Sequence, residues 1–369
     1  MLAYLRLSTE AASGRKYPEP RHPYRNDYQR DRDRIIHSRS FRRLEGKTQV
    51  FAPGLSDHFR NRLTHTLEVA QISRTVAFVL GLNEEFTETL ALAHDIGHPP
   101  FAHAGEHELN RQMQRFGLSF EHNLHSLRLV DRLEQRYALF DGLNLTFAVR
   151  EGIVKHSREV PVGAEGILAE FLPGLKPPLE AQLLDIADEI AYNTADLDDA
   201  YSAGMISFEG MATIPFLAER IERAETMFPG APDKIRFNEI QRALINTLVG
   251  GFIEGTKSNA EQKNIKTTED VRHAGERIAV LTPEASGLNQ QLKALLTSRV
   301  YDSPVLAEHR HSAASKIRWL FDYFLEHPEH IPSGFRENLE SEPSARVVCD
   351  YIAGMTDGFF LKTYAQFAQ

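Results

Sequence analysis

Apolar residues that recur every three or four positions restrict the fold of this chain more than any other feature of its sequence. Val69, Ile72, Val76 and Val79 have this spacing, and Gly81 ends the pattern. An α-helix places such residues on one face, whereas a half-buried strand needs strict alternation of apolar and polar residues. We find no convincing alternating run, so the sequence predicts an all-α protein. The same helical spacing recurs at 183–197, 240–252 and 317–324.

The helical stretches are separated by loops rather than by an interdomain linker. Residues 157–178 are rich in proline and glycine, and a shorter loop surrounds "FPGAPDK". Neither loop has the low complexity of a linker, and the chain has no internal repeat. Hydrophobic residues make up 42% of the 369 residues, which is enough for a sizeable core. We therefore expect one large helical domain over 24–369, preceded by an N-terminal extension over 1–23.

Composition narrows the classes of function. No apolar run approaches the ~20 residues that span a bilayer, and the N-terminus lacks the long apolar region of a signal peptide, so we expect a cytoplasmic protein without a membrane partner. Cys349 is the only cysteine, which leaves no intramolecular disulfide. The net charge of −9 argues against extensive nucleic-acid binding. The basic segment 15–47 could still supply guanidinium groups for phosphate, or form a solvated helix face.

The segment "ALAHDIGHPPFAHAGE" (91–106) concentrates histidine and acidic residues around two prolines. Such groups are expensive to bury unless they are paired or bind a metal, and the pair His94-Asp95 follows an apolar helical stretch. With His65 and Asp188 this pair would give two imidazoles and two carboxylates, which suit Mn²⁺, Fe²⁺, Co²⁺, Zn²⁺ or Mg²⁺. The bare pattern is weak evidence, because sixteen histidines offer many accidental combinations.

Six blocks of the sequence together resemble the HD-domain deoxynucleoside triphosphate triphosphohydrolases, in particular the bacterial dGTPase-like proteins of the type 2 subgroup. The blocks are "NRLTHTLEVAQ", "ALAHDIGHPPFAHAGE", "FEHNLHSLRL", "REGIVKHS", "DIADEIAYNTADLDDA" and "DYIAGMTDGF". The likeness runs from about Tyr24 to the C-terminus and implies an all-α HD fold. It also implies hydrolysis of dGTP or other dNTPs at the α-phosphorus to deoxynucleoside and triphosphate, and thus control of the dNTP pool.

The same resemblance implies a cofactor, namely one divalent ion (Mg²⁺, Mn²⁺ or Co²⁺) per subunit. Its implied ligands are His65, His94, Asp95 and Asp188. The resemblance further implies a homo-oligomer, either a hexamer or a tetramer. It leaves a dNTP activator open, because family members differ in whether a nucleotide activates them.

Four residues correspond to family positions with catalytic roles. His103 and Glu106 are three apart and share one face of a helix that begins after the prolines, so Glu106 could orient the imidazole. The resemblance places His98 toward the substrate phosphates and His122 near the scissile bond, where a protonated imidazole could donate to the departing 5′ oxygen. For His122 a supporting role is equally compatible, because His125 lies three residues away.

Four further residues correspond to family positions that bind the substrate. Arg62 matches an arginine that contacts phosphate, and Gln49 matches a glutamine that contacts the sugar. Asp188, Tyr192 and Asp196 are spaced four apart, so they lie on one helical face. By the resemblance, Tyr192 packs against the deoxyribose and excludes a 2′ hydroxyl, and Asp196 accepts from the 3′ hydroxyl. Without the resemblance, a tyrosine at this spacing would indicate only a core position.

The chain departs from the family pattern at two positions. Ala102 stands where many relatives have glycine, and this is a minor change. Gly358, in "GMTDGFF", stands where relatives commonly have an arginine. If that arginine supports an interface or a regulatory contact, this chain lacks the contact.

Two other functions are compatible with the sequence. An HD-type phosphodiesterase or nucleotidase would use the same metal site but would leave Tyr192 and Asp196 without a role. A nucleotide-binding or weakly single-stranded nucleic-acid-binding module with little turnover would use the basic segment 15–47. The complete set of candidate ligands, with His103 and Glu106, favours an enzyme over such a module.

Overall fold

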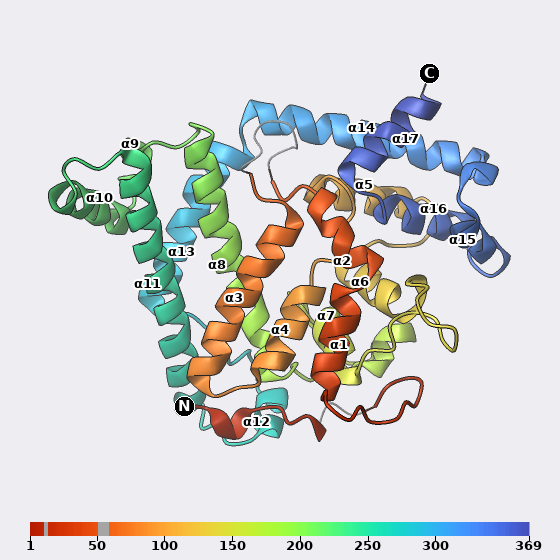
Figure 1. Cartoon of the computed structure of the whole chain (residues 1–369), viewed down its shortest axis with the longest axis horizontal. Helices are drawn as coiled ribbons and strands as arrows, with labels where there is room; N and C mark the ends of the chain where they lie inside the picture. The colour runs from red at the N-terminus through yellow and green to blue at the C-terminus, as the bar shows by residue number, and fades with distance from the viewer. Residues whose placement is uncertain (11–13, 51–58, 369) are drawn as a thin grey trace. The chain divides into compact units, whose positions relative to one another are not determined.

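The computed structural model describes residues 1–10, 14–50 and 59–368, and its regular elements are helices (Figure 1). Among these residues there is no strand, and only isolated bridges join Arg15 to Thr146 and Thr48 to Asn61. The prediction of an all-α fold is therefore confirmed. No helix in the described part of the chain combines the length and the apolar character that crossing a bilayer requires.

The chain folds into two compact units that alternate along the sequence. Unit 1 comprises Met1–Ser8, Glu68–Glu88 and His156–Pro304. Unit 2 comprises Thr9–Leu67, Thr89–Lys155 and Val305–Gln369. Because each unit is assembled from three separate stretches, no single cut of the chain divides them. The division into an extension over 1–23 and a core over 24–369 stays a prediction.

Unit 1 is built around three long helices that pack against one another, α8, α11 and α13. Leu183, Leu244 and Leu292 from these helices are fully buried, and the apolar spacing predicts this burial for the first two. Its elements, besides most of α3 (Arg62–Leu80) and the start of α4 (Glu84–Ala93), are η1 (Ala3–Leu5), η5 (Gly166–Glu170), α8 (Leu179–Ser202), α9 (Phe208–Met211), α10 (Pro215–Met227), α11 (Asp233–Gln262), α12 (Thr268–His273), α13 (Pro283–Leu296) and η6 (Thr297–Tyr301).

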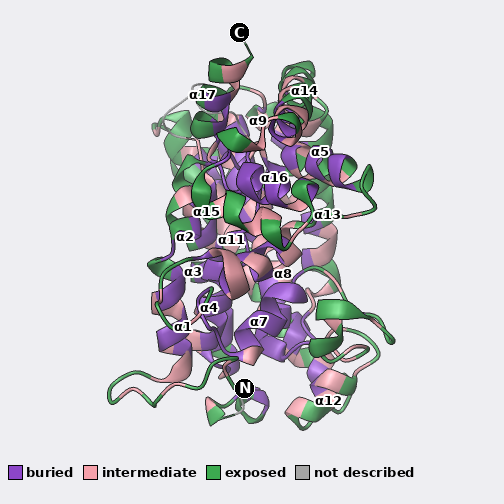
Figure 2. Cartoon of the chain, turned by 90° about the vertical axis from the view of Figure 1, so that its right-hand side faces the viewer, coloured by how far each residue is buried: buried purple, intermediate pink, exposed green. Residues whose placement is uncertain are grey.

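Unit 2 has its own apolar core, in which Leu109 and Met113 of α5 pack with Ile317 and Phe321 of α14 and with Val348 of α16. Figure 2 shows α7 and α16 as largely buried helices. Its elements, besides the start of α3 (Arg62–Leu80) and the end of α4 (Glu84–Ala93), are α1 (Asp27–Ile36), α2 (Arg39–Arg43), η3 (Leu44–Gly46), α5 (Ala102–Gln114), α6 (His122–Arg128), η4 (Leu129–Leu133), α7 (Phe147–Val154), α14 (Pro304–Glu326), η7 (Pro328–His330), α15 (Ser333–Arg336), η8 (Glu337–Glu340), α16 (Ser344–Ala353) and α17 (Asp357–Phe367).

Local sequence signals account for several helix boundaries. The Asn26 side chain accepts from the Gln29 backbone N–H, and Gln29 accepts in return from the Asn26 N–H, which forms a capping box at α1. Thr282 caps α13, whose first residue is Pro283. The predicted loop at 157–178 contains only the short helix η5 before α8 begins.

Candidate active site

Three of the predicted metal ligands, His65, His94 and Asp95, come together in unit 2. His65 lies in the first turn of α3, and His94 and Asp95 directly follow the last residue of α4. All three are buried, and one potential ligand atom of each lies within 4.8 Å of the others. His94 Nε2 is 3.4 Å from Asp95 Oδ1, and His65 Nε2 is 4.0 Å from Asp95 Oδ2. The helix ends therefore bring two imidazoles and a carboxylate together.

The orientation of His94 fits a metal ligand. Its Nδ1 lies 2.7 Å from the carbonyl oxygen of Ala91. A carbonyl can only accept, so Nδ1 carries the hydrogen and Nε2, the atom nearer Asp95, keeps the lone pair. Metal-binding histidines are commonly held in this way, with the second ring nitrogen donating to a carbonyl or carboxylate. Together with the mixed nitrogen and oxygen donors, this arrangement fits a divalent ion such as Mn²⁺, Co²⁺ or Zn²⁺.

One arginine and two histidines surround Asp95. Arg62 Nη1 donates to Asp95 Oδ2 over 2.7 Å, and His98 Nδ1 lies 2.9 Å from Oδ1. Burial alone would raise the pKa of this carboxyl, but His94, Arg62 and His98 hold it well below its usual value. Burial lowers the pKa of His98, and Arg62 and His122 lower it further. Asp95 is thus an anion at neutral pH, the form that binds metal.

The four predicted catalytic residues also meet in unit 2. His98 and His122 stack with their ring centroids 3.8 Å apart. Glu106 Oε1 accepts from the backbone N–H of His122 over 2.8 Å and lies 2.8 Å from His122 Nδ1, whereas its second oxygen is 3.9 Å from His103 Nδ1. Burial would raise the pKa of Glu106, but His103 and His122 lower it overall. Glu106 therefore holds His122 more closely than the predicted partner His103, whose side chain is 74% exposed.

The two departures from the family pattern have different structural settings. Phe101 and Ala102, where α5 begins, have φ values of 62° and 54°. This left-handed region suits glycine, and alanine there is strained by roughly 1–2 kcal/mol. Gly358 is exposed in α17, and a Cβ added there would meet no atom within 4 Å. An arginine would therefore fit at this position without moving the backbone.

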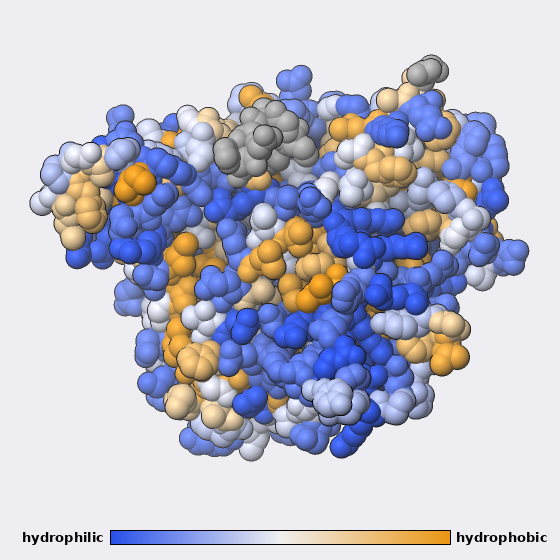
Figure 3. Space-filling model, in the orientation of Figure 1, coloured by the Kyte–Doolittle hydropathy of each residue, from blue (hydrophilic) through white to orange (hydrophobic). Residues whose placement is uncertain are grey.

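The basic segment 15–47 is largely engaged within unit 2. Arg15 pairs with Asp27 and Asp31, and Arg34 pairs with Glu19, so neither is available for phosphate. The surface over α1 and α2 is mostly hydrophilic (Figure 3). A hollow of about 420 Å³ in this unit is lined by Arg39, Arg42, Arg43, Glu45, Gly46 and Thr356.

Three further predicted residues, Asp188, Tyr192 and Asp196, lie along α8 in unit 1, whereas Gln49 is buried in unit 2. His156 lies between two acids of this helix, with Nδ1 2.7 Å from Asp185 Oδ1 and Nε2 3.6 Å from Asp188 Oδ2. Burial alone would lower the pKa of His156, but Asp185 and Asp188 raise it to about 10. Asp188 therefore has a positive neighbour, and its role as the fourth metal ligand stays a prediction.

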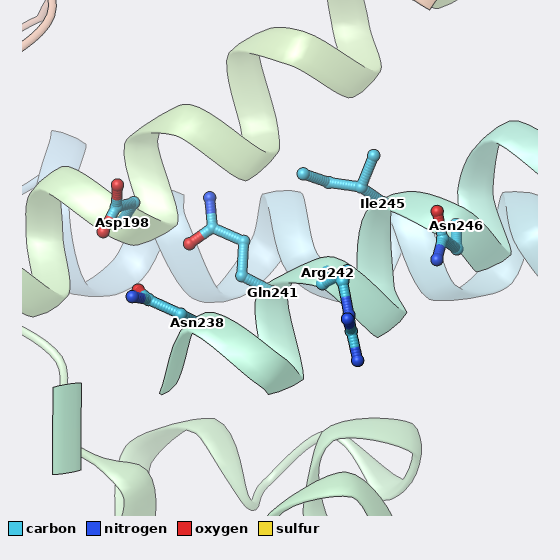
Figure 4. Close-up of a pocket in the computed structure, with 6 residues that line it drawn as sticks. All are labelled: Asp198, Asn238, Gln241, Arg242, Ile245 and Asn246. Carbon is cyan, nitrogen blue, oxygen red and sulfur yellow. The ribbon is translucent and has the colours of Figure 1, made fainter. Parts of the chain in front are cut away.

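Tyr301, which the sequence analysis did not single out, contacts two of the predicted site residues. Its hydroxyl donates to Asp196 Oδ2, and its ring stacks on Tyr192 with the centroids 5.8 Å apart. Burial and the neighbouring Asp196 raise the pKa of Tyr301, so it stays a donor. A separate polar hollow of about 330 Å³ in unit 1 contains none of the predicted residues (Figure 4). It is lined by Asp198, Asn238, Gln241, Arg242, Ile245 and Asn246.

The residues that carry the candidate ligands coincide with a known domain. The chain matches the HD domain over residues 62–193, and the phosphohydrolase-associated domain over residues 279–366. The fold is all-α, and the buried cluster of His65, His94 and Asp95 lies inside the HD domain. Together these features define a metal-dependent phosphohydrolase.

Relatives of this chain carry a common name. A deoxyguanosinetriphosphate triphosphohydrolase-like protein of Geobacter sulfurreducens is 43% identical over 95% of this chain and 91% of its own. Proteins with the same name from Azoarcus sp. and Ralstonia nicotianae are 42% identical (98% of this chain, 95% of theirs) and 44% identical (95% and 90%). The chain belongs to this family of deoxyguanosinetriphosphate triphosphohydrolase-like proteins and is a hydrolase.

Proposed function

We propose that the chain hydrolyses deoxynucleoside triphosphates at the α-phosphorus, releasing deoxynucleoside and intact triphosphate. The observation that carries this proposal is the buried His65, His94 and Asp95 cluster, with His98 and the Glu106–His122 pair in the same unit. A divalent ion held by these ligands and by Asp188 would activate water and neutralise charge on phosphorus. We propose that this ion is Mg²⁺, Mn²⁺ or Co²⁺.

The reaction needs a proton at the oxygen that leaves the α-phosphorus, because a new bond forms from water and the bond to O5′ breaks. We assign this donation to His122, whose Nδ1 faces Glu106 and whose Nε2 is therefore the nitrogen left for the substrate. His103, exposed at the start of α5, is assigned to the water or the α-phosphate. Arg62 adds positive charge for the phosphate oxygens, and His98 is assigned to the same phosphates.

The sugar is assigned to α8 of unit 1 and to Gln49 of unit 2. Tyr192 would pack against the deoxyribose and exclude a 2′ hydroxyl, and Asp196 would accept from the 3′ hydroxyl. Tyr301 supports this assignment, because it holds both side chains through its ring and its hydroxyl.

Further parts of the proposal concern the setting of the reaction. We propose a cytoplasmic homo-oligomer, hexameric or tetrameric, that a dNTP activates. Weak binding of single-stranded nucleic acid would use basic residues such as those that line the hollow at α2.

Product analysis tests the reaction directly. The metal-stripped chain is incubated with each dNTP and with GTP, singly and mixed, after addition of Mg²⁺, Mn²⁺ or Co²⁺. We expect deoxynucleoside and triphosphate in equal amounts, and a higher rate in dNTP mixtures if activation occurs. Release of orthophosphate would indicate the phosphodiesterase or nucleotidase function instead, and tight binding without products would indicate a binding module.

A further inference from the structure

Asp357 is a buried acid that the proposed reaction does not use, although it lies in the sequence block "DYIAGMTDGF". It is the first residue of α17, and its two carboxylate oxygens have different partners. Oδ2 accepts from the backbone N–H of Thr48 over 3.0 Å and from the Thr48 hydroxyl. Oδ1 accepts from the backbone N–H of Phe101 over 3.1 Å. One side chain thus joins two segments that are about fifty residues apart in the sequence.

Lys47 provides a second connection between the same regions. Its buried ammonium group donates to the carbonyl oxygen of His98 and, over 3.0 Å, to that of Ala353, which lies just before Asp357. The Lys47 carbonyl in turn accepts from the Arg62 N–H over 3.1 Å at the start of α3. All of these residues belong to unit 2.

The two joined segments each lead to residues with proposed roles. Thr48 directly precedes Gln49, which is assigned to the sugar. Phe101 lies between His98 and His103 and has a left-handed backbone, a conformation that persists only where the surroundings hold it. The Phe101 ring also packs edge-on against Phe360 of α17, with the centroids 5.1 Å apart.

We propose that Asp357 is a positioning residue of the active site, which fixes the segment of Gln49 and the turn between His98 and His103 relative to each other. This role gives the phosphohydrolase-associated segment a function in the reaction, since Asp357 lies within its match at 279–366. The kinetic part of the inference rests on the proposed function, because it takes Gln49, His98 and His103 as substrate-binding or catalytic groups. Asp357 itself acts only through the groups of Thr48 and Phe101 that it holds.

The substitution Asp357→Asn tests this role with almost no change in volume. An amide has one acceptor oxygen, so its NH₂ group must face the N–H of either Thr48 or Phe101. We expect kcat/KM for dGTP to fall by roughly 10–100-fold, the range typical for residues that orient a site from behind, with metal content unchanged. Hydrogen exchange should become faster in peptides covering 47–49 and 98–102.

The matched control is Asp31→Asn. Asp31 is equally buried, pairs with Arg15 and accepts from the Thr146 backbone N–H, and none of these groups has a proposed role in the reaction. The control should lower thermal stability without changing kcat/KM or exchange at 98–102. A second variant, Thr48→Val, should reduce kcat/KM as Asp357→Asn does, and the double variant should be no worse than the poorer single one.

The outcomes separate this inference from the proposed function. If the wild-type chain releases no triphosphate from any dNTP, the proposed function fails, and the exchange rates alone decide whether Asp357 holds the two segments. If the wild type is active but Asp357→Asn keeps its kcat/KM, the positioning role is wrong. Unchanged exchange at both segments, or losses that multiply in the double variant, would also overturn it.

Discussion

The two units differ in how they hold ionised groups at their candidate sites. In unit 2 one carboxylate, Asp95, lies among cationic or potentially cationic groups, and its pKa is held well below the usual value. In unit 1 one imidazole, His156, lies between Asp185 and Asp188, and its pKa is raised to about 10. The first arrangement keeps the carboxylate of Asp95 ionised at neutral pH, and the second keeps the imidazole of His156 protonated beside Asp188.

This difference bears on metal binding. A divalent ion at Asp95 would compete with Arg62 and His98 for the same carboxylate, whereas at Asp188 it would compete with a single imidazolium. The unit 2 group already has three donors within reach of one ion, so it should contribute most of the affinity.

The largest expected effect comes from removing candidate metal ligands in unit 2 or in unit 1. His94→Ala combined with Asp95→Ala should abolish both metal binding and hydrolysis, because two of the donors are lost. Asp188→Ala should do the same if the fourth ligand comes from unit 1. Metal content by elemental analysis and product release are the measurements, with Asp31→Asn as the control. Full metal content and activity in Asp188→Ala would restrict the metal site to unit 2.

A smaller loss should follow His103→Ala. We expect the rate to fall by about 10²–10⁴-fold with metal content retained, the range for removing general acid or base assistance. His107→Ala, four residues further along α5, is the control on the same helix and should keep its rate. If His103→Ala turns over at the wild-type rate, His103 has no role in proton transfer, and we would assign these transfers to His122 and Glu106.

The unit 1 residues should affect selectivity rather than metal content. Tyr192→Ala should weaken the preference for dGTP over GTP by up to about 10²-fold, since a shaped pocket rejects an added hydroxyl by about that factor. Tyr201→Ala, at a stacked tyrosine later in α8, is the matched control. Unchanged rejection of GTP in Tyr192→Ala would place the discrimination elsewhere.

The sequence predicted the helices and most of the unit 2 group because both depend on short-range patterns. Leu244, Leu248 and Phe252 follow helical spacing and are fully buried in α11. His94 and Asp95 are adjacent, so one helix end brings both to the same place. The family resemblance, rather than spacing, supplied the roles of Gln49 and Arg62.

Long-range pairs could not be predicted in this way. Tyr301 contacts Asp196 across 105 positions of sequence, from the end of η6, where no periodic pattern marks it. His156 lies in the block "REGIVKHS", yet nothing in that block indicates contact with Asp185. The shorter distance from Glu106 to His122 than to His103 likewise depends on how α6 packs, whereas helical spacing relates Glu106 only to its near neighbours on α5.

A third arrangement is that of Lys47, a buried cation that donates to two carbonyl oxygens. Burial, with Arg62 and Arg43 nearby, lowers its pKa from 10.5 to about 7, although Asp357 and Asp95 oppose the shift. Above about pH 7 the unfolded chain therefore binds more protons at this residue than the folded chain does. Its contribution to the free energy of unfolding should rise between about pH 7 and pH 10.5.

Urea unfolding of wild type and Lys47→Met at about pH 6 and about pH 9 checks this sign. The methionine variant should be relatively more stable at the lower pH, and its advantage should shrink by up to a few kcal/mol at the higher pH. An equal difference between the two proteins at both pH values would mean that Lys47 keeps an ordinary pKa in the folded state.

The smallest effect concerns backbone strain in unit 2, next to His103. Ala102→Gly should raise the free energy of unfolding by up to about 1 kcal/mol, because glycine adopts a φ of 54° without the penalty that a Cβ imposes. The greater freedom of glycine in the unfolded chain offsets part of this gain. Ala104→Gly, two residues further into α5, should instead lower it by about 1 kcal/mol, since that residue is ordinary helix. Opposite signs in the two variants, measured by urea unfolding, would show that the turn before His103 is strained. Loss of stability in both would mean that Ala102 relaxes to helical backbone in solution.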